Sequence, residues 1–144
     1  MTSSVRRRLA RSLPPPLRHF AHSIFRLYYN MGECIFCKIV AGTAKATIVY
    51  QDEHVTAFRD LHPVAPTHIL IVPNRHIESV GKLEEADIPI AGQLLLTARN
   101  LADQEGIAES GFRVVANTGV HGGQTVPHLH VHLIGGQRMN FPMG

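Results

Sequence analysis

Three histidines alternate with apolar residues near the end of the chain, in the segment HLHVHLI at 128–134. Successive side chains of a β-strand point to opposite faces, so this segment predicts a strand with His128, His130 and His132 on one face. Leu129, Val131 and Leu133 would lie on the other face and pack on a core. At ~3.3 Å per residue the outer two histidines would be roughly 13 Å apart, too far to ligate one ion together. The three imidazoles are therefore expected to have different tasks.

The order of the other predicted elements favours an α+β fold. Alternating or β-branched segments predict further strands over 47–50, 55–59, 67–72 and 112–116. One helix is expected over 88–105, with Asp87 as N-cap, Pro89 in the first turn and Gly106 after its end. The face expected to pack on the sheet consists of Ile90, Leu94, Ala98 and Leu101. This order predicts an antiparallel sheet of about five strands with one long helix, and not a doubly wound parallel sheet.

Residues 1–30 differ in composition from the rest of the chain. They contain six arginines and no acidic residue, which is typical of a transit peptide when serine is also frequent. We therefore expect a basic leader over 1–30 and a single domain over 31–144. Cleavage of such a leader would follow mitochondrial import, whereas translation from Met31 would give a cytoplasmic form. A basic arm that grips RNA is the third alternative for the leader.

The remaining 114 residues argue against two kinds of partner. They carry 8 of the 14 Lys and Arg residues and all 11 acidic residues, so their formal charge is −3. No basic patch is expected there, and no nucleic-acid partner is predicted. No segment approaches the ~20 apolar residues that span a bilayer, so no membrane partner is predicted either.

Three interpretations of the alternating histidines remain open at this point. They can form a polar strand face, or a His-x-His pair can hold a catalytic metal if a third ligand such as Asp60 approaches. In the third interpretation an imidazole attacks phosphorus, and water cleaves the resulting phosphohistidine. That chemistry needs donors for the phosphoryl oxygens. The turn Gly122–Thr125, directly upstream, offers backbone amides and the side chains of Gln124 and Thr125.

These segments together resemble the histidine triad superfamily, in its Hint branch of nucleoside phosphoramidases. The hallmark His-φ-His-φ-His-φ-φ, where φ is apolar, stands at 128–134, and the resemblance runs from Cys34 to the C-terminus. The other segments that carry it are CIFCKIVAG at 34–42, AFRDLHPVAPTHILIVPNRHI at 57–77 and ANTGVHGGQTVPHLHVHLIGG at 116–136. The resemblance implies a homodimer whose two sheets join into one. It also implies hydrolysis of the P–N bond of purine nucleoside 5′-phosphoramidates through a nucleotidyl-histidine intermediate, with no cofactor in the chemistry.

The resemblance also implies a role for each matching residue. His130 corresponds to the nucleophile, and His132 to the residue that binds the phosphate side and helps the amine to leave. Asp60 and Leu61 match the pair that holds the nucleoside, with Asp60 accepting from the ribose hydroxyls. The positions around the α-phosphate are Asn117, Gly123, Gln124 and Thr125. The apolar slot for the purine would be formed by Ile35, Phe36, Ile39, Phe58 and Leu70, each of which fits an ordinary core position equally well.

Cys34 and Cys37 form a Cys-x-x-Cys pair, which needs two further ligands to close a tetrahedral zinc site. In cysteine-bearing relatives the two others correspond to His76 and His128. The resemblance therefore implies a structural zinc, with His128 as a ligand and not a reactant. The alternative is two reduced cysteines in the core. Separately, His68 lies in a predicted strand and is expected to orient the triad by hydrogen bonding.

Two departures from the family pattern bear on which amine leaves. Thr125 stands where the Hint branch often has Ser, and Phe141-Pro142-Met143-Gly144 stands in place of Trp-Pro-Pro-Gly. Two other functions suit the same fold. One is a dinucleoside polyphosphate hydrolase or another nucleotidyl transferase, although Gly135-Gly136 after the triad favours the Hint branch. The other is a nucleotide-binding adaptor that does not depend on catalysis.

Overall fold

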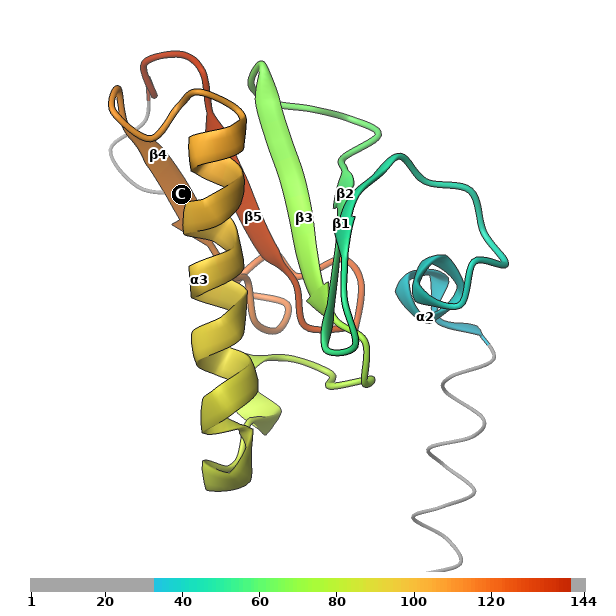
Figure 1. The fold of residues 1–144 in the computed structure, drawn as a ribbon. Helices are drawn as coiled ribbons and strands as arrows, with labels where there is room; N and C mark the ends of the chain where they lie inside the picture. The colour runs from blue at the N-terminus through green and yellow to red at the C-terminus, as the bar shows by residue number, and fades with distance from the viewer. Residues whose placement is uncertain (1–32, 141–144) are drawn as a thin grey trace, which may run out of the picture. The chain divides into compact units, whose positions relative to one another are not determined.

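A computed structural model describes residues 33–140. The predictions for the leader and for the C-terminal tetrapeptide lie outside these residues. Five antiparallel strands form one sheet in the order β1-β2-β3-β5-β4 (Figure 1). The strands are β1 (Ile48–Gln51), β2 (Val55–Arg59), β3 (Thr67–Pro73), β4 (Phe112–Val115) and β5 (Val131–Gly135). The helices are α2 (Ile35–Val40) and α3 (Ile88–Gln104), with 3-10 turns η1 (Val80–Lys82) and η2 (Glu85–Asp87). The predicted α+β class is confirmed.

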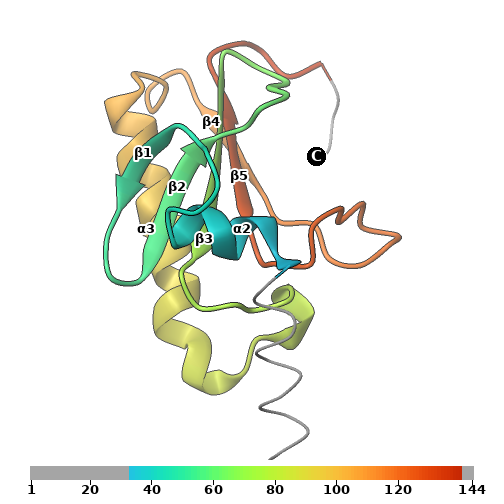
Figure 2. The ribbon, with the colours of Figure 1, turned by 90° about the vertical axis from the view of Figure 1, so that its right-hand side faces the viewer.

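The two helices cover opposite faces of the sheet. In Figure 2, α2 crosses in front of β2 and β3 while α3 lies behind them. On the α3 side, the helix packs on apolar residues of β2, β3 and β5. Of its predicted face, Leu94, Ala98 and Leu101 are buried, and Ile90 is partly buried against the same cluster. On the α2 side, a smaller cluster contains Phe36, Ile39, Phe58, Leu70 and Val72. Because both faces are covered, β3 is buried along its whole length. None of the described helices is long and apolar enough to cross a membrane.

The predicted N-cap of the long helix has a different task. Asp87 occupies the position before α3, but its side chain makes no capping hydrogen bond to that helix. Its carboxylate instead accepts from the Glu84 N–H at 2.9 Å and pairs with Arg75. Asp87 therefore connects the loop after β3 to the turn that precedes the helix.

The strand predicted over 128–134 starts three residues late, at Val131. The β3–β5 ladder begins with the pair Ile71–Val131. The next residue of β3 whose backbone groups point towards β5 would be Pro73. Proline has no N–H to donate to a ladder, and the Leu129 N–H instead donates to Ile77 O at 2.6 Å. His128 and His130 therefore precede the strand, and among the three histidines only His132 lies within it. The predicted opposite face is confirmed, because Leu129, Val131 and Leu133 all belong to the α3-side core.

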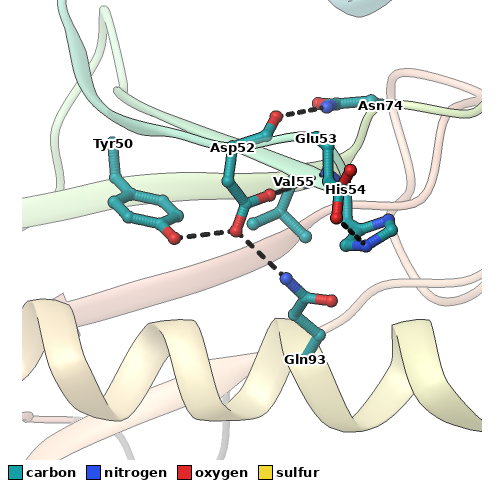
Figure 3. A network of polar contacts seen from close by, with 7 residues as sticks. All are labelled: Tyr50, Asp52, Glu53, His54, Val55, Asn74 and Gln93. Carbon is teal, nitrogen blue, oxygen red and sulfur yellow. Dashed lines mark hydrogen bonds and ion pairs between the residues drawn. The ribbon is translucent and has the colours of Figure 1, made fainter.

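A carboxylate organises the turn between β1 and β2 and connects it to α3 (Figure 3). One oxygen of Asp52 accepts from the N–H groups of His54 at 2.7 Å and Val55 at 2.8 Å. The other accepts from the Tyr50 hydroxyl at 2.7 Å and from Gln93 Nε2, on α3, at 3.1 Å. Desolvation raises the pKa of Asp52, but these hydrogen bonds outweigh it and hold the pKa below its usual value.

Asp52→Ala is expected to lower the free energy of unfolding by about 1–3 kcal/mol, because two turn amides and the helix amide lose a charged acceptor. Urea unfolding at neutral pH measures this difference. Tyr50→Phe removes only one of the four hydrogen bonds and is expected to cost less than about 1 kcal/mol. Equal stability of Asp52→Ala and the wild type would show that water replaces the carboxylate at no cost.

Candidate active site and metal cluster

Four sulfur and nitrogen donors converge between α2 and the loops at the end of β3 and the start of β5. Cys34 Sγ lies 3.4 Å from His128 Nδ1, and Cys37 Sγ lies 3.3 Å from His76 Nδ1 and 3.5 Å from His128 Nδ1. The two Nδ1 atoms are 3.2 Å apart. A tetrahedral zinc ion, with bonds of about 2.3 Å to sulfur and about 2.05 Å to nitrogen, sets S···N edges at about 3.5 Å and N···N edges at about 3.3 Å. The observed spacings fit that geometry.

Local structure explains how the two cysteines reach the cluster. Cys34 is the N-cap of α2 in an extended conformation, and its sulfur accepts from the Cys37 N–H at 3.5 Å. This short helix was not predicted, since six residues are too few to show a helical period. Burial, followed by hydrogen bonding and charge from Cys34, raises the pKa of Cys37 to about 12. The thiol therefore stays protonated unless a cation lies beside it.

The orientation of His128 suits a ligand. The ring is fully buried, and its Nε2–H donates to Pro73 O at 2.9 Å. The lone pair is therefore on Nδ1, which faces the cluster, as in metal sites whose histidines are held by a backbone carbonyl. Burial is the main cause that lowers the pKa of His128 to about 4, so the ring is neutral at pH 7 and able to coordinate. The structure thus separates His128 from the other two histidines of the triad.

His130 has its reactive nitrogen selected by a backbone contact. Its Nδ1 lies 2.6 Å from the carbonyl oxygen of His128. A carbonyl can only accept, so Nδ1 carries the hydrogen and Nε2 carries the lone pair. The side chain is almost buried and lies between two rings, with the centroid of Phe36 at 5.2 Å and that of His132 at 5.0 Å. This is the arrangement that a nitrogen nucleophile needs.

A second chain of contacts sets the tautomer of His132. The Val64 N–H donates to His68 Nδ1 at 3.1 Å, so the hydrogen of His68 is on Nε2. That Nε2–H donates to His132 Nδ1 at 2.9 Å, which leaves the hydrogen of His132 on its own Nε2. The predicted orienting contact of His68 is confirmed. Burial, and then the neighbouring His130 and His68, lower the pKa of His132 to about 4, so this ring is a neutral hydrogen-bond donor at pH 7.

The catalytic-metal interpretation is disfavoured by the same contacts. Asp60 does approach, with Oδ2 3.4 Å from His68 Nε2, and the donors of Asp60, His68 and His132 lie within 4.8 Å of one another. A metal at His68 Nε2 would need that nitrogen unprotonated, which moves the hydrogen to Nδ1 and against the Val64 N–H. The hydrogen-bonded chain therefore explains the cluster without a metal.

In the glycine-rich loop, residues 117–125, most of the predicted phosphate donors already make hydrogen bonds to other protein groups. Gln124 Oε1 accepts from the Gly119 N–H at 3.0 Å, and Gln124 Nε2 donates to Glu78 O at 2.7 Å. The backbone N–H groups of Gly123 and Gln124 also donate within the turn, to the carbonyls of residues 120 and 119. The side chain of Asn117 donates to Gly122 O at 2.6 Å. These predicted phosphate donors therefore hold the loop together, whereas Thr125 is exposed.

The residues predicted for the nucleoside fall into two groups. Phe36, Ile39, Phe58 and Leu70 are buried in the α2-side core, whereas Ile35 and Leu61 are 45% and 84% exposed. Ile39 and Leu61 border an open hollow of about 770 Å³, whose other walls are residues 42–48 and Gln51. The residues that sequence reasoning missed are Val64, Pro73 and Glu78, which act through backbone groups and so leave no side-chain pattern.

Known proteins resemble this chain in sequence over most of its length. A HIT domain model matches residues 41–139. The chain is 50% identical over 105 residues to the purine nucleoside phosphoramidase of Escherichia coli (strain K12), over 73% of this chain and 88% of that protein. It is 51% identical over 112 residues to the 14 kDa zinc-binding protein of Zea mays, over 76% of this chain and 87% of that protein. It is 49% identical over 112 residues to adenylylsulfatase HINT1 of Arabidopsis thaliana, over 76% of each chain.

The solved structures give the same result for the fold. The crystal structure of a HIT family hydrolase from Legionella pneumophila Philadelphia 1 superimposes with a TM-score of 0.76 and 44% identity, over 78% of this chain and all of that one. A histidine triad protein from Clostridium difficile gives a TM-score of 0.74 and 41% identity, over 76% of this chain and 95% of that one.

Proposed function

The chain belongs to the HIT domain family, and on that basis we propose that it hydrolyses the P–N bond of purine nucleoside 5′-phosphoramidates with His130 as the nucleophile. The relative named purine nucleoside phosphoramidase supports the substrate class. The observation that carries the chemistry is the 2.6 Å contact from His130 Nδ1 to the His128 carbonyl. It leaves the Nε2 lone pair available for attack on phosphorus.

The reaction has two displacements that balance in bonds and protons. In the first, His130 Nε2 forms a bond to phosphorus, the P–N bond breaks, and the leaving nitrogen takes up one proton from solvent. In the second, water bonds to phosphorus, the bond to His130 breaks, and one proton returns to solvent. The His132 ring lies 5.0 Å from the His130 ring between centroids, and its Nε2–H would donate a hydrogen bond to the phosphoryl group and so help the amine to leave, without giving up its proton. His68 is a positioning residue, because it fixes the tautomer of His132.

The nucleoside is proposed to lie next to this pair. Asp60 would accept from the ribose hydroxyls, and the exposed Leu61 and Ile35, with the rings of Phe36 and Phe58, would contact the purine. The exposure of Ile35 and Leu61 supports this contact, and the buried rings of Phe36 and Phe58 belong to the cluster on the α2 side of the sheet. The phosphate would contact the Thr125 hydroxyl and, once the loop adjusts, the groups at Asn117, Gly123 and Gln124.

Substrate comparison tests the proposed function. Turnover is measured on adenosine 5′-phosphoramidate, adenylyl sulfate and diadenosine polyphosphates. The proposal expects the highest kcat/KM for the phosphoramidate. Adenylyl sulfate is included because a relative is named adenylylsulfatase, and it would use the same nucleotidyl intermediate with a different leaving group. A higher kcat/KM for diadenosine polyphosphates would reject the proposal in favour of the polyphosphate hydrolase.

Gly122→Ala is expected to lower kcat/KM by about 100-fold, the scale of a 1 Å misplacement at an active site. A Cβ at this position would lie 2.3 Å from Thr118 O and 2.9 Å from Thr118 N, so the glycine-rich loop must shift. Steady-state kinetics on adenosine 5′-phosphoramidate measure the loss. The matched control is Gly92→Ala on α3, where an added Cβ meets nothing within 4 Å. An unchanged kcat/KM for Gly122→Ala would show that the loop plays no part in the reaction.

The low pKa of His132 predicts how stability depends on pH. The unfolded ring has a pKa of 6.5 and the folded ring about 4, so below pH 6.5 the unfolded state binds more protons at this site. The contribution of His132 to the free energy of unfolding is therefore complete above pH 6.5. It is lost as the pH falls towards about 4, at up to about 1.4 kcal/mol per pH unit. His132→Asn is expected to flatten the pH dependence of urea unfolding between pH 7 and pH 5. Parallel curves for the two proteins would contradict the prediction. The groups that face this ring are His130, His68 and Asp60.

We also propose that Cys34, Cys37, His76 and His128 hold a structural zinc ion. The donor set and its spacings fit that ion, and a relative is named a zinc-binding protein. When bound, the ion would supply a fixed connection between α2 and the loops next to β3 and β5. None of the bonds made or broken in the reaction involves it.

The homodimer remains a proposal supported by one exposed edge. β4 is the last strand of the sheet, and Phe112 and Val114 on it are each 36% exposed. Val114 pairs with Leu133 of the α3-side core, so these side chains face the α3 side, and Leu95 and Leu96 of α3 are also exposed. Antiparallel pairing of β4 with its copy would join the two sheets and cover this patch. Sedimentation equilibrium of the wild type and of Val114→Lys tests the pairing.

For the leader, mitochondrial import remains the proposal, with a cytoplasmic product from Met31 as its alternative. The six arginines of residues 1–30 support it. Localisation of the full chain, compared with a chain that starts at Met31, distinguishes the two.

A further inference from the structure

We propose that a tetrahedral divalent cation in the four-donor cluster fixes both the position and the ring tautomer of the nucleophile. The inference rests on the proposed role of His130 but concerns a different set of residues. In it the cysteines are positioning residues for His130, in addition to any contribution they make to stability. Three connections lead from the cluster to the active site: one starts at His128, one at the two cysteines and one at His76.

The first connection is the His128 backbone. Its ring is held at both nitrogens, with Nδ1 at the cluster and Nε2 at Pro73 O, 2.9 Å away. The carbonyl of the same residue accepts the His130 Nδ1–H at 2.6 Å. When a cation holds Nδ1, the carbonyl has one position, and that position selects the tautomer with Nε2 unprotonated. Without a cation, Nδ1 has only thiol and imidazole contacts, and the residue is less constrained.

The second connection is Phe36, which stands between the two cysteine ligands in sequence. Its ring packs edge-on against His130 at 5.2 Å and His128 at 5.9 Å. The ring lies on α2, and a six-residue helix is not stable by itself in water. The position of this helix therefore depends on its side-chain contacts. A cation bound to Cys34 and Cys37 would fix the turn that carries the ring.

The third connection begins at His76. The carbonyl of the next residue, Ile77, accepts the Leu129 N–H at 2.6 Å. The carbonyl after that, of Glu78, accepts Gln124 Nε2 at 2.7 Å. The short segment after His76 thus supports both the residue that precedes the nucleophile and the glycine-rich loop. A metal bound to His76 would therefore fix the positions of both Leu129 and the glycine-rich loop.

The test uses the full chain labelled with ¹⁵N in its histidine rings, with one equivalent of zinc and after removal of zinc by a chelator, at pH 8. With zinc, the His130 ring is expected to show a protonated Nδ1 and an unprotonated Nε2. Without zinc, the two ring signals are expected to move towards each other as the tautomers mix. Exchange of the Leu129 amide hydrogen is expected to become at least about tenfold faster. On adenosine 5′-phosphoramidate, kcat is expected to fall about tenfold while KM changes little.

Two variants separate positioning from general destabilisation. Cys34→Ser combined with Cys37→Ser removes both sulfurs and is expected to behave like the chelated wild type. His76→Cys keeps four donors and a tetrahedral site, and it is expected to retain the His130 tautomer of the loaded wild type. If the double variant does not fold, the chelated wild type still gives the result, with the amide spectrum of the sheet as the check on folding.

Identical His130 ring signals and identical Leu129 exchange with and without zinc would overturn the inference, as would a wild type that does not bind zinc. The outcome for the proposed function is separate. A zinc-dependent tautomer in a protein that does not hydrolyse the phosphoramidate supports the inference and rejects the function. Hydrolysis with a tautomer that is independent of zinc does the reverse.

Discussion

His130→Ala is expected to reduce kcat on adenosine 5′-phosphoramidate by at least about 10⁴-fold, the scale of losing a covalent nucleophile. The substitution removes His130 Nε2. The contact of Nδ1 with the His128 carbonyl fixes the tautomer, so the Nε2 lone pair is available to attack phosphorus. His132 does not replace it, because its Nδ1 is occupied by His68 and its Nε2 carries a hydrogen. Single-turnover and steady-state kinetics both measure the loss.

Mass spectrometry of a rapidly quenched reaction gives the direct evidence. The wild type is expected to carry a nucleotide on His130 during turnover, and His130→Ala is expected to carry none. His54→Ala is the matched control, since this histidine lies exposed at the turn between β1 and β2 and is expected to leave kcat unchanged. Steady turnover by a wild type that never carries the adduct would reject covalent catalysis. If cells retain the protein's function with His130→Ala, the adaptor interpretation is preferred.

Removal of the metal is expected to have the largest effect on stability. An ion present at 1,000 times its Kd contributes about 4 kcal/mol to the native state, which for a domain of this size corresponds to about 15–20 °C in Tm. Cys37→Ser removes one of the four donors. It is expected to lose the bound zinc and, with it, this increase in Tm. Calorimetry, with metal analysis of the same samples, measures the two together.

The chelated wild type is the control for this second prediction. It is expected to unfold near the temperature of Cys37→Ser, because both lack the ion, and added zinc is expected to restore only the wild type. A wild type purified without zinc, whose Tm does not respond to added zinc, would favour the alternative of two reduced core cysteines. The burial that raises the pKa of Cys37 suits that alternative as well, so the measurement decides between them.

Much of the fold could be predicted because its patterns are local. The alternation at 55–59 and the β-branched run at 67–72 give β2 and β3 within one residue. Of the predicted face of α3, Leu94, Ala98 and Leu101 are buried and Ile90 is partly buried. The start of β5 could not be predicted from its own alternation. It depends on Pro73, a residue far away in sequence that leaves the ladder without a donor at that point. Helix α2 could not be predicted either, because its six residues are held by contacts with distant segments.

By itself the sequence determined the family, the α+β class and the residue types of the site, because spacing along a strand and the Cys-x-x-Cys pair are properties of neighbouring residues. Only the tertiary structure decided which nitrogen of each histidine is available. The Pro73 carbonyl turns His128 Nδ1 towards the cysteines, and the Val64 N–H, acting through His68, places the hydrogen of His132. A tautomer is set by a single partner atom, and in this protein most of those atoms belong to the backbone of segments that meet only in the folded chain.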